Sequence, residues 1–119
     1  MVGQRTIIAG SRSIRDFGVV CRAIEASGFS VAEVVSGGAY GVDRLAERYA
    51  RLHWIPVRRF LPDWSRFGRS AGPRRNQQMV DYAGGAGQLI AVWDGRSRGT
   101  QHTIQMAQAS GLSVFVFRT

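Results

Sequence analysis

Apolar residues gather in five short runs along the chain, and longer segments of mixed polarity separate these runs. Each run is rich in valine, isoleucine, alanine or phenylalanine, which is typical of a strand buried inside a sheet. The predicted strands cover residues 6–9, 33–36, 55–60, 88–93 and 114–117. Between the runs, apolar residues recur every three or four positions, as they do on the buried face of a helix. The predicted helices cover residues 17–27, 44–52, 73–82 and 101–110.

Residues with strong helix-end preferences mark several of these boundaries. Asp16 and Thr100 precede helical patterns and carry oxygens that can cap the first turn of a helix. Gly28 and Gly111 follow helical patterns, where glycine commonly ends a helix. Pro73 suits the first turn of the third helix. These signals support the helix boundaries that the spacing indicates.

The alternation of strands and helices predicts an α/β fold. We expect a Rossmann-like three-layer sandwich with a mostly parallel five-stranded sheet, formed as a single domain over residues 1–119. Pro56 indicates that the third strand begins near it or lies at an edge of the sheet, because proline cannot donate a hydrogen bond within a sheet.

Four loops rich in glycine or serine follow predicted strands. They cover residues 10–13, 36–41, 61–72 and 94–99. The C-terminal ends of parallel strands meet at one edge of the sheet, and ligands bind at the point of that edge where strand order reverses. The opposite ends of the strands carry fewer polar residues. We therefore expect these four loops to build a binding site.

The second of these loops carries the strongest local pattern. Two valines lead into Gly37, Gly38 and Gly41, and Asp43 stands in the first turn of the helix that follows. Glycine lets the backbone approach a ligand closely, and the start of a helix favours negative charge. The glycines also suit a simple turn, and Asp43 also suits a partner of the helix dipole, so the pattern alone leaves both interpretations open.

The other loops add polar side chains of the kinds that hold phosphates and sugars. Ser11 and Arg12 follow the first strand, Arg75 and Asn76 stand near a helix start, and Asp94 ends the fourth strand. The predicted ligand-binding residues are Gly10, Ser11, Arg12, Ser36, Gly37, Gly38, Ala39, Gly41, Asp43, Arg75, Asn76, Asp94, Gly95, Gly99 and Thr100. Among them, backbone groups of Gly37, Gly38 and Thr100 are expected to hold phosphate.

The charge of the chain indicates an anionic partner. Sixteen basic residues, all of them arginine, outweigh eight acidic ones, for a net charge of +8. The absence of lysine from the sequence excludes a Walker A lysine and a Schiff-base mechanism. A basic surface attracts nucleic acid as well as small anions. The segment 58–75 interleaves six arginines with Trp64 and Phe67, which suits base stacking, single-stranded nucleic acid or a solvated loop.

Several other classes of site find no support in the sequence. His53 and His102 lack partners at metal-ligand spacing, so we expect no metal site and no bound cofactor. Ser36 lacks the surroundings of a hydrolase nucleophile. Cys21 is a single cysteine, and no apolar run is long enough to span a membrane. We expect a cytoplasmic protein without membrane contact.

Four motifs together resemble the SLOG superfamily, and specifically its YspA-like, cpYpsA-related domain family of bacteria and phages. The motifs are Ala9–Arg12, Ser36–Asp43, Ala71–Met79, and Trp93–Gly95 with Arg98–Thr100. The resemblance covers nearly the whole chain. It implies a Rossmann-like fold whose glycine loops bind nucleotides or nucleotide-derived ligands such as ADP-ribose, including as sensors of signalling nucleotides.

The resemblance also implies two other functions, because relatives include phosphoribohydrolases and DNA-processing proteins that bind single strands. The phosphoribohydrolases carry a glutamate three residues after the threonine of their glycine–threonine motif, and Thr103 occupies that position here. If the protein is an enzyme, Asp94 or Asp43 would serve as its acid or base. The sequence therefore favours ligand binding over catalysis. Relatives also pair through helices, so we expect a homo-oligomer.

Overall fold

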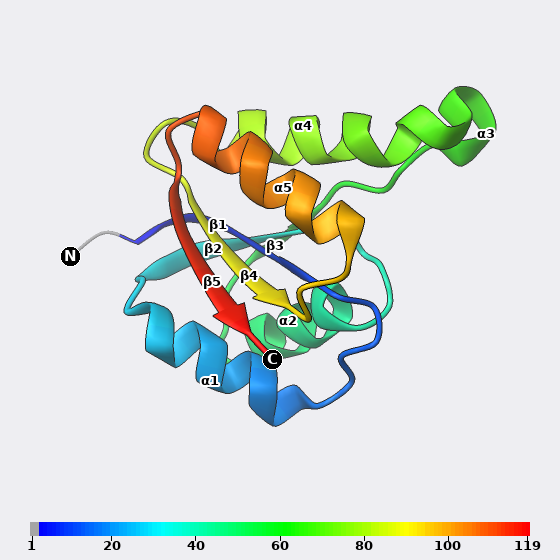
Figure 1. The fold of residues 1–119 in the computed structure, drawn as a ribbon. Coiled ribbons are helices and arrows are strands. Elements are labelled where there is room, and N and C mark those ends of the chain that lie inside the picture. The colour runs from blue at the N-terminus through cyan, green and yellow to red at the C-terminus, as the bar shows by residue number, and fades with distance from the viewer. Residues whose placement is uncertain (1–2) are drawn as a thin grey trace.

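The computed structural model of the protein describes residues 3–119, which fold into one sheet with helices on both faces (Figure 1). The strands are β1 (Gln4–Gly10), β2 (Val31–Ser36), β3 (Val57–Arg59), β4 (Gln88–Trp93) and β5 (Ser113–Arg118). The helices are α1 (Phe17–Ser27), α2 (Val42–Leu52), α3 (Trp64–Phe67), α4 (Ala71–Ala83) and α5 (Arg98–Ala109), with a 3-10 turn η1 at Gly68–Ser70. Within residues 3–119, none of the helices combines the length and the apolar character needed to cross a membrane.

The five strands run in the order β3-β2-β1-β4-β5, and every neighbouring pair is parallel. Helices α1 and α2 cover one face of the sheet, and α4 and α5 cover the other (Figure 1). The predicted Rossmann-like sandwich is thus confirmed. From β1 the chain builds outward to β3, then crosses to the other side of β1 to form β4 and β5. The strand order therefore reverses between β1 and β4, which is where such sheets bind ligands.

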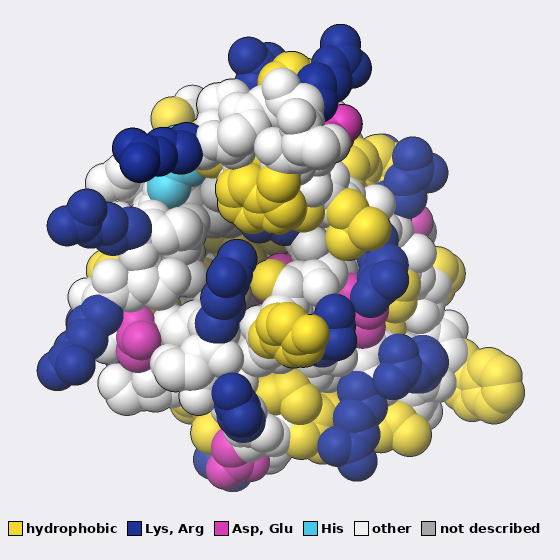
Figure 2. Space-filling view, turned by 90° about the vertical axis from the view of Figure 1, so that its right-hand side faces the viewer, with side chains coloured by type: hydrophobic (Ala, Val, Ile, Leu, Met, Phe, Trp, Pro, Cys, Tyr) yellow, Lys and Arg dark blue, Asp and Glu magenta, His cyan; other side chains and the backbone are white. Residues whose placement is uncertain are grey.

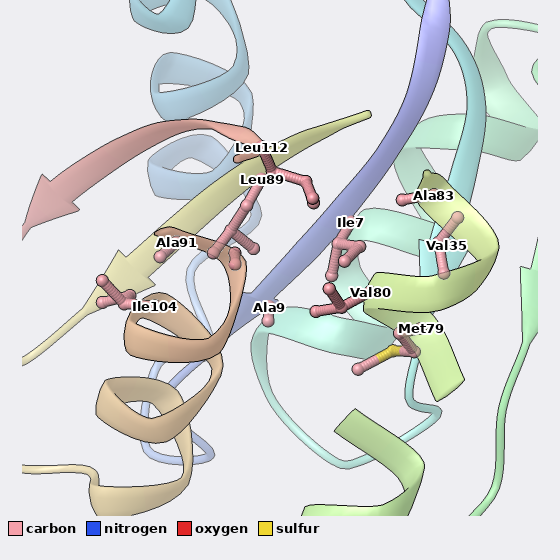
Figure 3. Packing of buried hydrophobic residues seen from close by; sticks show 11 residues of the cluster. Ile7, Ala9, Val35, Met79, Val80, Ala83, Leu89, Ala91, Ile104 and Leu112 are labelled. Carbon is pink, nitrogen blue, oxygen red and sulfur yellow. The ribbon is translucent and has the colours of Figure 1, made fainter. Parts of the chain in front are cut away.

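Alternating side chains of the strands supply two separate apolar layers. Ile7 of β1 packs in the layer beneath α4 and α5 with Val80 and Ile104, whereas the adjacent Ile8 packs beneath α1 and α2 with Val20. Figure 3 shows the first layer, in which Val80 of α4 lies beside Ile7 of β1. Since Ile7 and Ile8 are both fully buried, packing on both faces holds β1 at the centre of the sheet. The loop after β1 therefore starts from a well-packed strand.

The predicted cap of the first helix is confirmed, and that of the last helix is wrong. The Asp16 carboxylate accepts the Gly18 N–H at 2.8 Å, at the start of α1. At the start of α5, however, Ser97 is the cap and accepts the Thr100 N–H at 3.3 Å. Ser97 has the extended backbone of a cap, whereas Thr100 already lies inside the helix. Because the helix begins earlier than predicted, Thr100 lies in the first turn of α5.

Segment 61–72, predicted as a loop, contains α3, η1 and the first residues of α4. The Asp63 carboxylate caps α3 by accepting the Arg66 N–H at 3.2 Å. This short helical segment extends beyond the body of the domain at one end of α4 (Figure 1). The neighbouring strand β3 follows Pro56 directly and lies at the sheet edge, as predicted.

Candidate functional site

A cavity of about 410 Å³ opens at the C-terminal ends of β1 and β4, where the strand order reverses. We call it the switch-point pocket. Figure 2 looks onto this edge of the sheet and shows arginine and large hydrophobic side chains around a hollow. Ten of the predicted ligand-binding residues line it: Gly10, Ser11, Arg12, Ala39, Asp43, Arg75, Asn76, Asp94, Gly99 and Thr100. The topology therefore brings residues from four distant segments into one cavity.

A second cavity of about 210 Å³ shares Arg12, Ala39 and Arg75 with the switch-point pocket. We call it the outer pocket. The predicted residues Gly37 and Gly38 line this pocket rather than the first. The remainder of its lining is Tyr40, Arg44, Leu61, Pro62 and Trp64. The two arginines common to both cavities mark the boundary between them.

Three predicted site residues, Ser36, Gly41 and Gly95, line neither cavity. Ser36 is fully buried at the end of β2, next to residues 37–41, which we call the glycine loop. Gly41 has a left-handed φ of 82°, and a Cβ there would lie 2.7 Å from the Arg12 backbone. Gly95 has a similar φ of 81° and leaves room for the Arg118 side chain. These three residues shape the loops around the site.

The switch-point pocket also contains residues that sequence reasoning missed. They are Ala9, Ser13, Met79, Ser97 and Thr103. A signal for two of them was available, because Met79 follows Arg75 by four residues and Thr103 follows Gly99 by four, so each lies one helical turn beyond a predicted residue. Helical spacing from the predicted residues would have found both.

Asp43 is the most perturbed acid of the pocket. It is 6% exposed, and its Oδ2 atom accepts the Ala39 N–H at 3.2 Å. Burial raises the pKa of Asp43 to about 6, against the lowering effects of the Ala39 N–H, Arg75 and Arg12. Glu47 nearby raises the pKa further. Asp43 can therefore gain and lose a proton near neutral pH.

Asp94, the second acid of the pocket, has the opposite environment. Its Oδ1 atom accepts the N–H groups of Arg96 at 2.8 Å and Ser97 at 2.9 Å. These two hydrogen bonds lower the pKa of Asp94 below its ordinary value. Its own N–H donates to Ser11 Oγ at 3.1 Å, which ties the loops after β1 and β4 together. Asp94 is thus a fixed, ionised acceptor.

Two arginines supply positive charge between the cavities. Arg75 donates through Nη1 to the Gly37 carbonyl oxygen at 2.7 Å and through Nε to Asn76 Oδ1 at 3.0 Å. Burial lowers the pKa of Arg75, and the nearby Asp43 raises it. Arg12 follows β1 and is exposed. A guanidinium group binds phosphate oxygens in pairs, so the boundary between the cavities suits an anion.

The backbone donors of the loops are less available to a ligand than the sequence suggested. The Gly38 N–H donates to Ser36 Oγ at 3.1 Å, the Ala39 N–H donates to Asp43, and the Thr100 N–H donates to Ser97. Side chains of the protein therefore already use the Gly38 and Thr100 N–H groups, two of the three expected to hold phosphate. The charge that an anion meets comes instead from the guanidinium groups.

The arginine-rich segment 58–75 is divided among several roles. Arg59 pairs with the buried Glu47, with its Nη2 atom 2.9 Å from Oε1. Arg66 and Arg74 lie over the ring of Phe67 at 4.9 and 4.2 Å. Of the six arginines, Arg75 lines the cavities. Binding of single-stranded nucleic acid to this segment stays a prediction.

Comparison with known proteins gives the chain its family. Residues 4–67, more than half of the chain, match the model of the "YspA, cpYpsA-related SLOG family". The chain belongs to this SLOG family. The "Gene 61 protein" of Mycobacterium phage D29 is similar over 123 aligned positions, with 37% identity and 96% of each chain covered. No solved structure matches the chain significantly. Membership of the SLOG family points to nucleotide-related binding or glycosidase-like activity.

Within the SLOG domain, Thr103 occupies the position at which the related phosphoribohydrolases carry a glutamate. Thr103 lines the switch-point pocket, and its hydroxyl donates to the Gly99 carbonyl at 3.0 Å. The carboxylates of the pocket lining are therefore Asp43 and Asp94. Over residues 3–119, no three His, Cys, Asp or Glu side chains group together as they would around a metal ion.

Proposed function

We propose that this protein binds a nucleotide-derived small molecule, of the ADP-ribose type, across the switch-point pocket. The observation that carries the proposal is the presence of two arginines, Arg12 and Arg75, and two carboxylates, Asp43 and Asp94, around one cavity. Cations bind phosphates, and carboxylates accept hydrogen bonds from sugar hydroxyls, so the two kinds of group match the two polar parts of a nucleotide.

Each residue has a distinct part in this proposal. Arg12 and Arg75 pair with phosphate at the cavity boundary. Asp94 is held ionised by two backbone N–H groups, and it accepts sugar hydroxyls without changing protonation state. Asp43 accepts a further hydroxyl, with its position set by the Ala39 N–H. The cavity volume of about 410 Å³ falls within the roughly 300–1,000 Å³ of small-molecule sites.

Thermal unfolding in the presence of mono-, di- and cyclic nucleotides and ADP-ribose tests the proposal. A ligand that binds the native state alone raises the melting temperature. We expect at least one compound to do so, and Arg12→Ala to abolish the shift. The matched control is Arg15→Ala, because Arg15 is exposed and lies outside both cavity linings. Absence of a shift with every compound would refute the proposal.

A second candidate function is hydrolysis of the N-glycosidic bond of nucleoside phosphates. The raised pKa of Asp43, about 6, favours it, because a general acid works best when its pKa is near the operating pH. In this mechanism Asp43 donates its proton to the departing base, and the base leaves with the bonding electrons. A water molecule then adds its oxygen to the anomeric carbon of the sugar and loses a proton, which restores the proton on Asp43. Asp94 is the weaker candidate for the acid, because its pKa is lowered.

Release of free base from nucleoside 5′-monophosphates, followed by chromatography, tests the hydrolase function. Asp43→Asn is expected to abolish release, because a carboxamide is far too weak an acid to protonate the departing base. Asp94→Asn is expected to weaken substrate binding while leaving measurable turnover at saturation. The absence of any released base at high protein concentration would exclude this function and leave ligand binding in place.

We also propose that the protein associates with itself through the end of the sheet opposite the pockets. Trp54, between α2 and β3, is 94% exposed, and the nearby Leu52 is 59% exposed. Exposed apolar groups of this size are frequent at contacts between proteins. Light scattering should give a mass above that of one chain, and Trp54→Ser should lower it to that of one chain. A monomeric wild type would refute the proposal.

A further inference from the structure

The two cavities differ in the chemistry of their walls. The switch-point pocket is lined by hydroxyls, carboxylates, an amide and arginines, and its apolar side chains are Ala9, Ala39 and Met79. No aromatic residue is part of that lining, which lies wholly within the described residues. The outer pocket, in contrast, contains two aromatic rings, Tyr40 and Trp64. The surfaces that suit sugars and rings are therefore separate.

The apolar residues of the outer pocket are unusually open to solvent. Tyr40 is 68% exposed, Leu61 is 62% exposed and Trp64 is 52% exposed. Tyr40 belongs to the glycine loop, Leu61 to the loop between β3 and α3, and Trp64 to the start of α3, and all three line the outer pocket. The Arg44 guanidinium lies 4.2 Å from the centre of the Tyr40 ring, on one side of it. Aromatic side chains held open in this way stack readily on a flat ring.

Two glycines, Gly38 and Gly72, make room for apolar side chains of the outer pocket. A Cβ on Gly38 would collide with Leu61 at 2.6 Å, so the absence of a side chain at position 38 lets Leu61 lie on the backbone. Trp64 approaches α4 at Gly72, with its Cη2 atom 3.6 Å from the position that a Cβ on Gly72 would take. The outer pocket is therefore a formed feature of the fold, with a backbone floor and aromatic walls.

We propose that the outer pocket binds the aromatic base of a nucleoside diphosphate sugar, whose sugar end occupies the switch-point pocket. The base stacks against Tyr40 and Trp64, and the diphosphate crosses the boundary at Arg12 and Arg75. This assignment rests on the function proposed above and adds the place where the base binds and the orientation of the ligand. It gives specific roles to Tyr40 and Trp64, which lie in two of the loops that the sequence predicts to build the site.

Charge and size favour this orientation over the reverse. Asp43 and Asp94 line the switch-point pocket and are absent from the lining of the outer pocket, so their charges would repel a phosphate from the first cavity, whereas their oxygens accept sugar hydroxyls there. The arginines shared by both cavities are the favourable place for the diphosphate. The outer pocket, at about 210 Å³, is smaller than the roughly 300–1,000 Å³ of complete ligand sites, so it suits one ring system.

Titration calorimetry with matched probes tests the proposal. The probes are ADP-ribose and UDP-glucose, each with its base-free counterpart, in which the same diphosphate joins the sugar to a ribose that carries no base. We expect at least one base-containing probe to bind the wild type about tenfold more tightly than its counterpart, as one stacked base typically provides. Trp64→Ala and Tyr40→Ala should each remove most of this preference, while affinity for the base-free probe stays the same.

Arg15→Ala is the control, since Arg15 is exposed and lies outside both cavity linings. It should preserve the preference in full, and urea unfolding of all three variants should show that each is folded. If base-containing and base-free probes bind the wild type equally, or if Trp64→Ala and Tyr40→Ala keep the preference, the base site is refuted while ligand binding stands. If no probe binds the wild type, this proposal is refuted, and the nucleotide panel decides whether the proposed function survives.

Discussion

The Arg75 guanidinium donates to the Gly37 carbonyl oxygen over 2.7 Å, although 38 positions separate the two residues in the sequence. This hydrogen bond ties α4 to the loop that follows β2, across the boundary of the two cavities. Position 37 must be a glycine for it to form, because a Cβ there would meet Arg75 Nη1 and lie 2.9 Å from Asp43 Oδ2. The loop and the arginine therefore determine each other's position.

Replacement of Arg75 by lysine should show how much this contact contributes. A lysine cannot donate to the Gly37 carbonyl and to Asn76 Oδ1 in the geometry of a guanidinium. We expect Arg75→Lys to lower the free energy of unfolding by about 1–2 kcal/mol and to weaken binding of the ligand found in the nucleotide panel. Urea unfolding and calorimetry measure the two effects. Arg74→Lys, one position away and exposed, is the control, and equal results for both variants would contradict the prediction.

The pH dependence of stability should carry the signature of Asp43. Its pKa is raised from 3.8 to about 6 in the folded protein, mainly by burial. An acid with a raised pKa contributes stability that is complete below its unfolded pKa and is lost as the pH rises through its folded pKa. Ionised Asp43 therefore costs the folded state on the order of 3 kcal/mol above that range.

The variant Asp43→Asn removes this cost and can keep the hydrogen bond from the Ala39 N–H through its amide oxygen. We expect the free energy of unfolding of Asp43→Asn, minus that of the wild type, to be larger near pH 8 than near pH 4, by up to about 3 kcal/mol. Urea unfolding of both proteins at the two pH values measures the difference. A difference that does not change with pH would show that the pKa of Asp43 is not raised.

Ser36 should be important for stability although it lines neither cavity. Its hydroxyl donates to Glu47 Oε2 at 2.6 Å and accepts the Gly38 N–H at 3.1 Å, and Arg59 completes the pairing of Glu47. Ser36→Ala leaves the Gly38 N–H without this partner and removes one of the hydrogen bonds of the buried Glu47, which we expect to cost about 1–3 kcal/mol. The exposed Ser113 offers the control, since Ser113→Ala should change stability by less than about 0.5 kcal/mol. Similar losses in the two variants would contradict the prediction.

Gly41 should tolerate no side chain. It combines a left-handed φ of 82° with a Cβ position 2.7 Å from the backbone of Ser11 and Arg12. Neither backbone can move without displacing the loop after β1, so we expect Gly41→Ala to cost more than about 2 kcal/mol. Gly85 has neither constraint, and Gly85→Ala should be close to neutral. Thermal and urea unfolding distinguish the two outcomes, and a stable Gly41→Ala protein would refute the account.

Single-stranded DNA should bind through net charge rather than through segment 58–75. The net charge is +8, so affinity should fall steeply as salt rises. Since Arg66 lies over Phe67, replacing Arg66 and Arg69 by alanine should reduce affinity no more than replacing the exposed Arg22 and Arg51. Fluorescence anisotropy at two salt concentrations measures this. A much larger loss from the first pair would establish a nucleic-acid site on that segment.

Much of the fold could be predicted because its signals are local. The run Gln88–Trp93 reads as a buried strand from its apolar residues alone, and β4 has those bounds. Asp16 and Gly28 mark α1 through capping preferences that depend on neighbouring residues only. Segment 61–72 could not be predicted in the same way, because α3 has four residues, too few for a periodic pattern, and depends on its cap at Asp63.

The same distinction between local and long-range signals applies to the candidate site and to the residues that support it. Ser11, Asp43 and Asp94 could be chosen from sequence because each follows a strand, and parallel topology brings strand ends together. Glu47 could not, because in the sequence it resembles any polar residue of an amphipathic helix, and its burial arises from Ser36 and Arg59.

The sequence by itself therefore determined the succession of the five strands and the four longer helices along the chain, the family, and the edge of the sheet where polar loops gather. These follow from periodicity, capping and motifs, which act over a few residues. Only the tertiary structure decided that Asp43 is buried and Asp94 is held by N–H groups, and that Tyr40 and Trp64 form a second cavity beside the first. Burial, pKa and cavity shape depend on contacts between segments that are distant in sequence, so local pattern does not contain them.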